Sequence, residues 1–256
     1  MTMTSEAKPS DVDRAQQPAL VLLHGFALDS RMWRRQVEAF SSEYRVVTLN
    51  LPGFGPQARE LGEVDASVGV LRALDVARID RAHLVANSFG AAVATDFALQ
   101  HPERVRSLTL SGPLLLGRRT GIEAWARCVA LASEGDRATA AEIWLDDPLF
   151  ESLRNDEELF EELRQIVLDY GGHHWTGRVS AKWSDPDPAP SLRKLDIPAL
   201  VISGEMDIPS FMLMAEAYAR TLPRARREIV QNAGHLANLE RPMQWNALLR
   251  DFLRDI

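Results

Sequence analysis

Six short runs of apolar and β-branched residues recur along the chain, and each has the length of a buried strand. They cover residues 19–24, 45–50, 82–87, 105–110, 197–203 and 225–231. Most of these runs are apolar on both faces, which is typical of strands in a parallel sheet that is covered by helices on each side.

Segments of helical length and period separate these runs. We expect helices at residues 30–40, 64–76, 88–100, 211–222 and 243–252. Within them, apolar residues recur every three or four positions, which places them on one face of a helix. The repeated alternation of strand and helix predicts the α/β fold class, with a doubly wound, mostly parallel sheet.

Residues 113–196 break this rhythm. They contain no good strand and several helical patterns, one of which follows a capping box formed by Asn155 and Glu158. The spacing of Ile122, Trp125 and Val129 marks another helix. Four of the six tryptophans lie in this stretch, which also has ten basic and sixteen acidic side chains. We expect its acids to face solvent and its inner face to be apolar.

These patterns divide the chain into three parts. Residues 19–112 and 197–256 form an α/β core, and residues 113–196 form a helical insertion. Residues 1–18 are a polar lead-in that we expect to be disordered, because they offer little apolar surface to bury.

Composition limits the class of protein and the class of partner. The 256 residues are 46% hydrophobic and 25% charged, as is usual for a globular chain. The net charge of −7 argues against a nucleic-acid partner, which would need a concentrated positive face. No apolar run is long enough to span a membrane, and the start lacks the apolar region of a secretory signal. We expect a cytoplasmic monomer or homodimer whose single cysteine, Cys128, forms no internal disulfide.

Candidate catalytic groups follow the strands, at the edge where an open parallel sheet binds its ligands. Ser88 lies in the strand–turn–helix sequence Val85-Ala-Asn-Ser-Phe-Gly-Ala-Ala92, with small residues two positions before and after it. A serine on such a turn has a strained backbone and an exposed hydroxyl, which suits a nucleophile. The string alone fits an ordinary helix N-cap better, but the strand directly upstream favours the nucleophile.

His235 and Asp207 are the candidate base and acid. Each lies in a loop after a predicted strand, and a buried carboxylate can hold an imidazole in one tautomer. Glu205 is a rival for the acid. The structural alternatives are, for His235, a solvent-facing loop histidine or one that caps the last helix, and, for Asp207, a turn-forming aspartate. His173 and His174 are adjacent and point apart, so they do not form a two-ligand metal site, although one of them can line a pocket.

Two backbone N–H groups beside Ser88, those of Phe26 and Phe89, are the candidate oxyanion hole. Along the chain, Ser88, Asp207 and His235 follow the order nucleophile, acid, base, and each comes after a different predicted strand. This order and placement match the arrangement of α/β hydrolases.

The chain resembles the α/β-hydrolase fold superfamily from about residue 19 to its end. The residues that carry the resemblance are Leu22-Leu-His-Gly-Phe26, Asn50-Leu-Pro-Gly-Phe-Gly55, Ala86-Asn-Ser-Phe-Gly90, His101-Pro-Glu-Arg-Val105, Gly204-Glu-Met-Asp207, Gly234-His235 and Glu240-Arg-Pro242. Together they are specific for the superfamily but not for a substrate. The chain is similar to small carboxylesterases, lactonases, carbon–carbon bond hydrolases of aromatic degradation and the pimeloyl-ester esterase of biotin synthesis.

The resemblance implies that Ser88, His235 and Asp207 are nucleophile, base and acid, and that the N–H groups of Phe26 and Phe89 hold the oxyanion. It also implies that residues 113–196 cap the site and that neither a metal nor an organic cofactor takes part.

The chain departs from the family's pattern at several places. Ala86 stands where glycine is usual, Asn50 where relatives often carry aspartate, and Pro56-Gln57 where an Arg-Ser pair is common. Relatives usually have two antiparallel strands before the first motif, and residues 1–18 offer little for them. We therefore expect a sheet that is one or two strands shorter at that edge.

We expect a serine hydrolase that cleaves a small-molecule carboxylic ester or lactone through an acyl-enzyme. Its substrate contacts are assigned to Gly25, Trp125 and Trp144. The apolar inner face expected for the insertion favours an uncharged or partly hydrophobic substrate.

Other activities of the same fold stay open. A carbon–carbon hydrolase would act on a dienoic ketone and would need a cation for the substrate carboxylate, such as Arg118, Arg119 or Arg178. A lyase, a cofactor-free haloperoxidase-like enzyme and a weakly catalytic ligand-binding protein are further alternatives. An epoxide hydrolase or dehalogenase is disfavoured, because those relatives carry aspartate where Ser88 stands.

Overall fold

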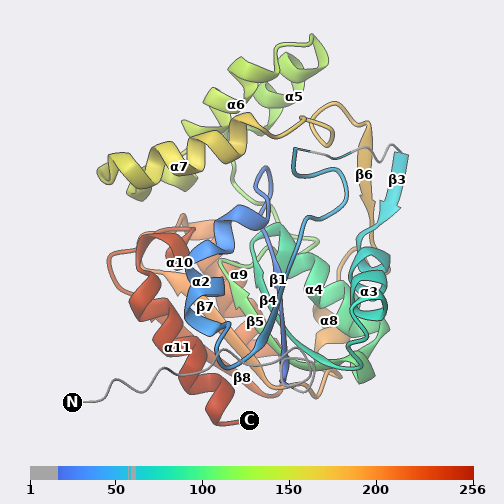
Figure 1. The fold of residues 1–256 in the computed structure, drawn as a ribbon. Coiled ribbons are helices and arrows are strands. Elements are labelled where there is room, and N and C mark those ends of the chain that lie inside the picture. The colour runs from blue at the N-terminus through green and yellow to red at the C-terminus, as the bar shows by residue number, and fades with distance from the viewer. Residues whose placement is uncertain (1–16, 57, 59–61) are drawn as a thin grey trace, which may run out of the picture.

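Six parallel strands form the central sheet of the protein (Figure 1). The computed structural model describes residues 17–56, 58 and 62–256. The strands are β1 (Ala19–Leu23), β2 (Arg45–Leu49), β4 (Ala82–Asn87), β5 (Val105–Ser111), β7 (Ala199–Gly204) and β8 (Ala225–Val230). The six predicted strands and the α/β class are therefore confirmed. The lead-in expected over residues 1–18 lies outside the described residues, except for 17 and 18.

The first strand lies inside the sheet, not at its edge. The strand order is β2-β1-β4-β5-β7-β8, and β1 pairs in parallel with both β2 and β4. The direction of winding therefore reverses between β1 and β4, and ligands bind at the carboxyl edge beside such a reversal. The loops after these two strands, which carry Phe26 and Ser88, meet there. The expectation of strands missing beyond β2 concerns residues before 17, outside the described part.

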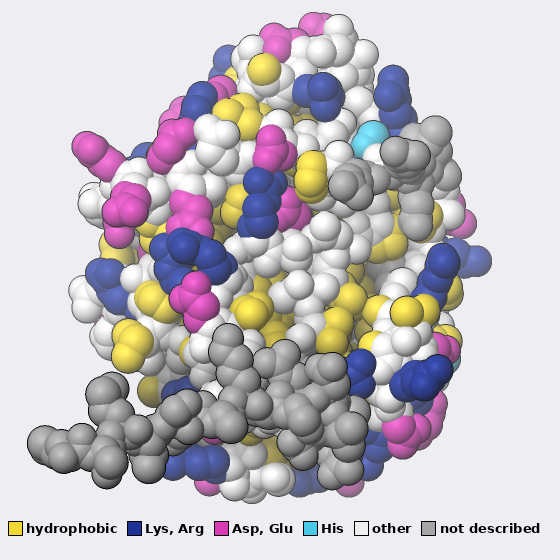
Figure 2. Space-filling model, in the orientation of Figure 1, with side chains coloured by type: hydrophobic (Ala, Val, Ile, Leu, Met, Phe, Trp, Pro, Cys, Tyr) yellow, Lys and Arg dark blue, Asp and Glu magenta, His cyan; other side chains and the backbone are white. Residues whose placement is uncertain are grey.

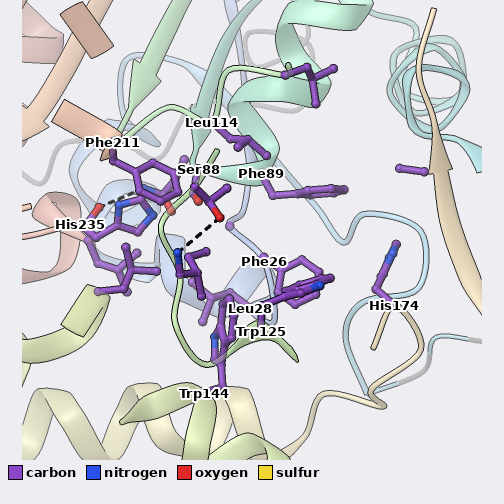
Figure 3. A pocket seen from close by; sticks show the side chains of 18 of the residues that line it. Phe26, Leu28, Ser88, Phe89, Leu114, Trp125, Trp144, His174, Phe211 and His235 are labelled. Atoms are coloured by element: carbon purple, nitrogen blue, oxygen red, sulfur yellow. Dashed lines mark hydrogen bonds between the residues drawn. The ribbon is translucent and has the colours of Figure 1, made fainter. Parts of the chain in front are cut away.

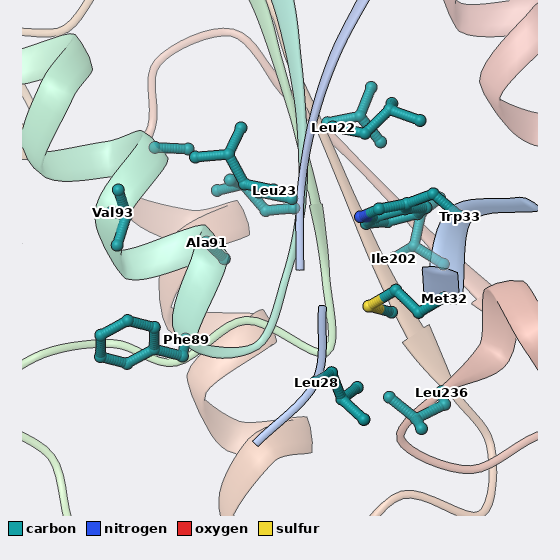
Figure 4. Packing of buried hydrophobic residues seen from close by; sticks show 14 of the residues in the cluster. Leu22, Leu23, Leu28, Met32, Trp33, Phe89, Ala91, Val93, Ile202 and Leu236 are labelled. Carbon is teal, nitrogen blue, oxygen red and sulfur yellow. The ribbon is translucent and has the colours of Figure 1, made fainter. Parts of the chain in front are cut away.

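Helices cover both faces of the sheet. One face carries the 3-10 turn η1 (Ser30–Trp33), α2 (Arg34–Phe40), α10 (Ala237–Glu240) and α11 (Pro242–Arg254). The other carries α3 (Ala66–Val76), α4 (Phe89–Gln100), the turn η2 (Pro102–Arg104), α8 (Ala189–Leu192) and α9 (Pro209–Thr221). Figure 4 shows Met32 and Trp33 on one side of β1, with Ala91 and Val93 of α4 on the other.

The centre of the sheet is its best-packed part. Every residue of β1, β4 and β7 is buried, whereas β2 and β8, at the two edges, are mostly half-buried. Close packing restricts the movement of these buried strands. The ends of β1, β4 and β7 are therefore held in place, and so are the starts of the loops that carry Phe26, Ser88 and Asp207.

The insertion lies beyond the carboxyl edge of the sheet (Figure 1). It contains α5 (Trp125–Ser133), α6 (Arg137–Leu145), the 3-10 segment η3 (Pro148–Asn155) and α7 (Glu157–Leu168). Helix α6 packs against both α5 and α7. Among the described residues, no helix is both long and apolar enough to cross a membrane.

The insertion also contains a strand, so the prediction that residues 113–196 hold none is wrong. Strand β6 (Val179–Lys182) pairs in parallel with β3 (Gly62–Asp65). Four residues are too few to show a period, and the partner lies far away in the sequence. The helix expected from residue 64 accordingly begins at residue 66, where the Asp65 side chain accepts the N–H of Ser67 at 3.0 Å.

The predicted capping box is wrong by one residue. The N-cap of α7 is Asp156, whose Oδ1 accepts the N–H of Leu159 at 3.0 Å. Asn155 instead ends η3, and its Nδ2 donates to the carbonyl oxygen of Ser152 at 3.2 Å. Aspartate and asparagine are about equally good N-caps, so composition alone does not choose between neighbours.

Acidic side chains of the insertion lie mainly on its surface, where they interleave with arginines on the face seen in Figure 2. Asp147 departs from this expectation, because it is only 3% exposed. Its Oδ2 accepts the N–H groups of Glu123 and Ala124, both at 2.9 Å, and its Oδ1 accepts that of Leu149 at 3.0 Å. This carboxylate therefore ties the start of α5 to η3.

Candidate active site

Ser88 lies on a strained turn between β4 and α4. Its φ of 51° and ψ of −115° fall in a region that residues other than glycine seldom occupy. Its N–H donates to the carbonyl oxygen of Ser111 at 3.0 Å, and its carbonyl oxygen accepts the N–H of Leu114 at 3.2 Å. Strain of this kind costs about 1–3 kcal/mol and persists only where the surroundings fix it. The turn brings the Ser88 side chain to the wall of a pocket.

Gly90 lets this turn approach the end of β1. A Cβ at Gly90 would lie 2.5 Å from the carbonyl oxygen of Leu23 and 2.6 Å from that of His24. Backbone atoms at such distances must move, so only glycine fits. Two residues before Ser88, the methyl group of Ala86 is accommodated in the core without exposure, which explains why alanine can replace the usual glycine.

His235 and Asp207 form a buried pair. Nδ1 of His235 donates to the Asp207 carboxylate, at 3.1 Å from Oδ1 and 3.0 Å from Oδ2. Their side chains are 2% and 0% exposed. A carboxylate only accepts, so the proton of the neutral imidazole lies on Nδ1 and Nε2 keeps its lone pair. Nε2 is buried and has no hydrogen-bond partner among the described residues, and His235 lines the same pocket as Ser88.

The loops that carry this pair approach each other closely. A Cβ at Gly204 would lie 2.1 Å from the carbonyl oxygen of Gly234, so glycine is required at the end of β7. Glu205, the rival acid, is exposed, and its Oε2 accepts the N–H of Asn232 at 3.1 Å. The structure therefore places Asp207, and not Glu205, beside the histidine.

Two backbone N–H groups are available where the loops after β1 and β4 meet. Those of Phe26 and Phe89 donate to no other residue that the structure describes. The N–H of Phe89 also lies at the positive end of the twelve-residue helix α4. Both residues line the pocket, and their ring centroids are 6.0 Å apart. Donors of this kind can stabilise a developing oxyanion.

His24 holds the loop that carries Phe26. The N–H of Leu51 donates to Nε2 of His24 at 2.9 Å, so the ring proton lies on Nδ1, which donates to the carbonyl oxygen of Gly25 at 2.8 Å. The side chain is completely buried, and burial lowers the pKa of His24 from 6.5 to about 4. The imidazole is therefore neutral near pH 7 and serves as donor and acceptor at once.

The pocket beside Ser88 has a volume of about 450 Å³ (Figure 3). Leu28, Leu114, Leu149 and Val179 are among its aliphatic lining. Its aromatic lining comprises Phe26, Phe89, Trp125, Trp144, Phe150, Trp183 and Phe211. None of the described residues that line it is aspartate, glutamate, lysine or arginine. The pocket therefore suits an uncharged, largely apolar molecule.

Seven of the eight residues predicted for the site line this pocket: Gly25, Phe26, Ser88, Phe89, Trp125, Trp144 and His235. Asp207 does not reach the wall and lies behind the histidine. Trp144 is buried and Trp125 is 40% exposed, and both rings pack on Phe26, with centroid distances of 5.2 and 5.1 Å.

Several pocket residues were not predicted from the sequence. Phe211 packs edge-on against His235 at 4.4 Å between centroids, and Trp183 packs against Phe89 at 5.6 Å. A weak signal existed for both, since Phe211 follows the Asp207 loop and Trp183 precedes the proline-rich end of the insertion. Asn87, which directly precedes Ser88, also lines the pocket.

His174 is the member of the histidine pair that lines the pocket. Its Nε2 donates to the carbonyl oxygen of Pro52 at 3.0 Å, and its ring stacks on Phe54 at 4.4 Å. Burial lowers the pKa of His174. His173 lies outside this pocket. In the part of the chain that the structure describes, no group of three or more His, Cys, Asp and Glu side chains is placed to hold a metal ion.

Comparison with known proteins gives consistent matches. The family model described as alpha/beta hydrolase fold matches residues 18–242. The 2-hydroxy-6-oxononadienedioate/2-hydroxy-6-oxononatrienedioate hydrolase of Paraburkholderia phymatum is 31% identical, over 93% of this chain and 88% of that protein. The pimeloyl-(acyl-carrier protein) methyl ester esterase of Aeromonas hydrophila is 29% identical, over 93% and 96% of the two chains. The structure of a thermophilic esterase from Thermogutta terrifontis has a TM-score of 0.74 and 27% identity, over 93% of this chain and 90% of that one.

Proposed function

Because this chain belongs to the alpha/beta hydrolase fold family, we propose that it is a serine hydrolase that cleaves neutral carboxylic esters or lactones through an acyl-enzyme. One fold hosts several chemistries, so the activity has to be argued from the site. One observation carries the proposal. Ser88 on its strained turn and the buried His235–Asp207 pair lie at a single pocket that has no charged side chain among its described lining.

In the proposed reaction, the Ser88 hydroxyl attacks the carbonyl carbon while Nε2 of His235 takes its proton. Asp207 stabilises the imidazolium through the Nδ1 hydrogen bond. The oxyanion accepts hydrogen bonds from the backbone N–H groups of Phe26 and Phe89. The alcohol leaves with the proton from His235, and water activated by the same histidine then hydrolyses the acyl-serine to release the acid.

The uncharged lining supports a neutral substrate. Burying a carboxylate without a partner costs several kcal/mol. Arg118, Arg119 and Arg178, the candidate anchors for such a group, are not among the residues that line the pocket. The relative from Paraburkholderia phymatum is named for a dienedioate, a dicarboxylate. The proposed substrate is therefore an ester or lactone and not a substrate of that kind.

The proposal is tested with p-nitrophenyl acetate, butyrate and octanoate near pH 8, using wild type and Ser88→Ala with a burst-phase readout. Wild type should show a burst and steady turnover, and Ser88→Ala should lose about 10,000-fold or more in kcat while keeping its melting temperature within a few degrees. A folded wild type with neither burst nor turnover would sink the esterase proposal.

A matched pair of esters tests the substrate charge. Mono-p-nitrophenyl adipate has the six-carbon acyl chain of p-nitrophenyl hexanoate but ends in a carboxylate. The neutral ester should have a kcat/KM about 100-fold higher or more, because the pocket offers the carboxylate no cation. Equal values for the two esters would show that the preference for neutral substrates is wrong and would return carbon–carbon hydrolysis to consideration.

A further inference from the structure

Asn87, the residue before Ser88, is completely buried beside the proposed catalytic groups. Its Nδ2 donates to the carbonyl oxygen of Ser111 at 3.1 Å and to that of His235 at 3.4 Å. Two carbonyl oxygens flank this end of the amide, so it must be the NH₂ end and the opposite atom must be Oδ1. The hydrogen bonds therefore fix the orientation of the amide.

The oxygen end of this amide faces Gly25. A Cβ added at Gly25 would lie 2.7 Å from Oδ1, so the hydrogen that Gly25 carries in that direction points at the amide oxygen. Oδ1 is buried and has no hydrogen-bond partner among the described residues. A Cα–H···O contact is weaker than an N–H···O bond, and an unpaired buried carbonyl oxygen is costly. An apolar residue would avoid that cost, so packing alone does not explain why an asparagine occupies this position.

We propose that Asn87 is a positioning residue that sets the relative placement of the nucleophile, the base and the oxyanion hole. The inference rests on the proposed serine-hydrolase function. The Ser111 carbonyl oxygen that binds Nδ2 also accepts the N–H of Ser88. The second acceptor of Nδ2 is the backbone of His235 itself.

The third contact of the amide controls the oxyanion hole. Gly25 directly precedes Phe26, whose N–H is one of the two proposed oxyanion donors. A planar amide pressed against Gly25 limits how closely this loop can approach Ser88. Asn87 thus contacts the backbone of His235, the carbonyl oxygen that binds the N–H of Ser88, and the residue before Phe26. Misplacement of reacting groups by about 1 Å can cost about 100-fold in rate.

The first test is Asn87→Ala, with kcat and KM measured on p-nitrophenyl butyrate. We expect kcat to fall about 10- to 100-fold while KM stays within about 3-fold, because alignment and not substrate contact is lost. Asn246→Ala is the matched control. Asn246 is also a buried asparagine, and its Oδ1 accepts from Nε2 of Gln36 at 3.0 Å, but it does not line the pocket. That variant should lose stability while kcat stays within about 2-fold.

The second test uses the contact with Gly25. Gly25→Ala should lower kcat about 100-fold, because its methyl group would push against Asn87 Oδ1 and move the oxyanion loop. In the double variant Gly25→Ala/Asn87→Ala the obstruction is gone, so kcat should rise above that of Gly25→Ala and approach that of Asn87→Ala. A double variant slower than both single variants would overturn the inference.

Asn87→Leu keeps the inference testable if the alanine variant does not fold. Leucine is close to asparagine in shape and buries no unpaired polar atom of its own, but it lacks both donors, so it should lower kcat with KM unchanged. The two proposals fail differently. If wild type and Ser88→Ala are equally inactive, the serine-hydrolase proposal fails. If wild type is active and the Asn87 variants match Asn246→Ala in kcat, only the role of Asn87 is wrong.

Discussion

The two walls of the pocket differ in the residues that form them and in how these residues are held. The core wall consists of loops that follow fully buried strands, and its polar groups are held by hydrogen bonds and by close backbone approaches at Gly90 and Gly204. The wall from the insertion presents mainly aromatic and aliphatic side chains, with Thr120, His174 and Ser180 as its polar members. The core wall is therefore expected to govern the chemical step, and the insertion is expected to govern the fit of the substrate.

The insertion is also attached to the core by contacts of unequal strength. Asp96 of α4 is 3% exposed, and its Oδ1 accepts both the N–H and the hydroxyl of Ser184, at 3.0 and 2.6 Å. Arg31 and Asp169, which pair at 2.7 Å, are both over 40% exposed. Exposed ion pairs contribute about 0–1 kcal/mol and weaken with salt. The Asp96 contact, next to Trp183, is therefore the firmer of the two attachments.

Asp207→Asn should give the largest effect and should be confined to the chemical step. The asparagine cannot stabilise the imidazolium and favours the wrong tautomer, so kcat should fall about 10,000-fold. KM for p-nitrophenyl butyrate should change little. Glu205→Gln is the control, since Glu205 binds only the N–H of Asn232, and it should keep kcat within about 3-fold. Similar losses in both variants would contradict the assignment of the acid.

Gly90→Ala tests how rigid the core wall is. The methyl group would meet two backbone carbonyl oxygens at 2.5 and 2.6 Å, so the free energy of unfolding in urea should fall by about 3 kcal/mol or more. Gly69→Ala is the matched control, because Gly69 lies in α3 and its added methyl meets only Pro52, at 3.6 Å. It should raise stability by about 0.5–1 kcal/mol. Equal effects of the two substitutions would mean that the close approach is not required.

The difference between the walls also explains what the sequence could predict. Most of the strands were predictable because their residues are apolar on both faces, and Ser88, Asp207 and His235 were candidates because each lies in the turn or loop that follows a predicted strand. Each of these signals lies within a few neighbouring positions of the chain. The core wall is built from such local patterns, so its candidate residues could be picked out one by one.

The wall from the insertion depends on contacts between distant segments. The pairing of β3 with β6 joins segments more than one hundred residues apart, and neither has a periodic pattern. Whether His173 or His174 faces the pocket depends on a hydrogen bond to Pro52, which lies 122 positions earlier. The sequence could not show that Asp147 is buried while neighbouring acids are exposed. Its three partners are backbone N–H groups, which nearly every residue type carries, so they leave no trace in the sequence.

Lowering the pH should reduce the free energy of unfolding, because the buried His24 beside the core wall favours its neutral form. Its folded-state pKa of about 4 lies below the unfolded value of 6.5, so the unfolded state binds more protons between these values. The stability that neutral His24 provides is complete above about pH 6.5 and is lost as the pH falls toward 4, by about 3 kcal/mol. Urea unfolding of wild type should follow this course.

The contribution of His24 to the pH dependence of stability is obtained from a variant. His24→Asn should be less stable than wild type at pH 7.5 and should lose less stability between pH 6.5 and 4.5. His83, whose pKa burial also lowers to about 4, remains in both proteins and cancels in the difference. Parallel pH dependences for the two proteins would show that His24 is not the titrating group.

Trp125→Ala tests whether the insertion wall affects substrate binding and not the chemical step. Trp125 is 40% exposed, so its removal should disturb the fold less than removal of the buried Trp144. The KM for p-nitrophenyl octanoate should rise about 10-fold with the loss of apolar contact, while the KM for the acetate should change less than about 2-fold. In both cases kcat should stay within about 3-fold. A fall in kcat for the acetate would contradict the division between the walls.

The smallest effect is expected for His174, one of the polar residues in the insertion wall. His174→Ala removes the contacts with Pro52 and Phe54, and should raise the KM for p-nitrophenyl octanoate about 3- to 5-fold with kcat unchanged. His173→Ala, one residue away and outside the pocket, should change neither constant by more than about 2-fold. Burial lowers the pKa of His174, so the imidazole is neutral near pH 8 and the effect should not vary above about pH 7. A loss of kcat in His174→Ala at unchanged KM would place this residue in the chemical step, and the boundary between the two walls would then have to include part of the insertion.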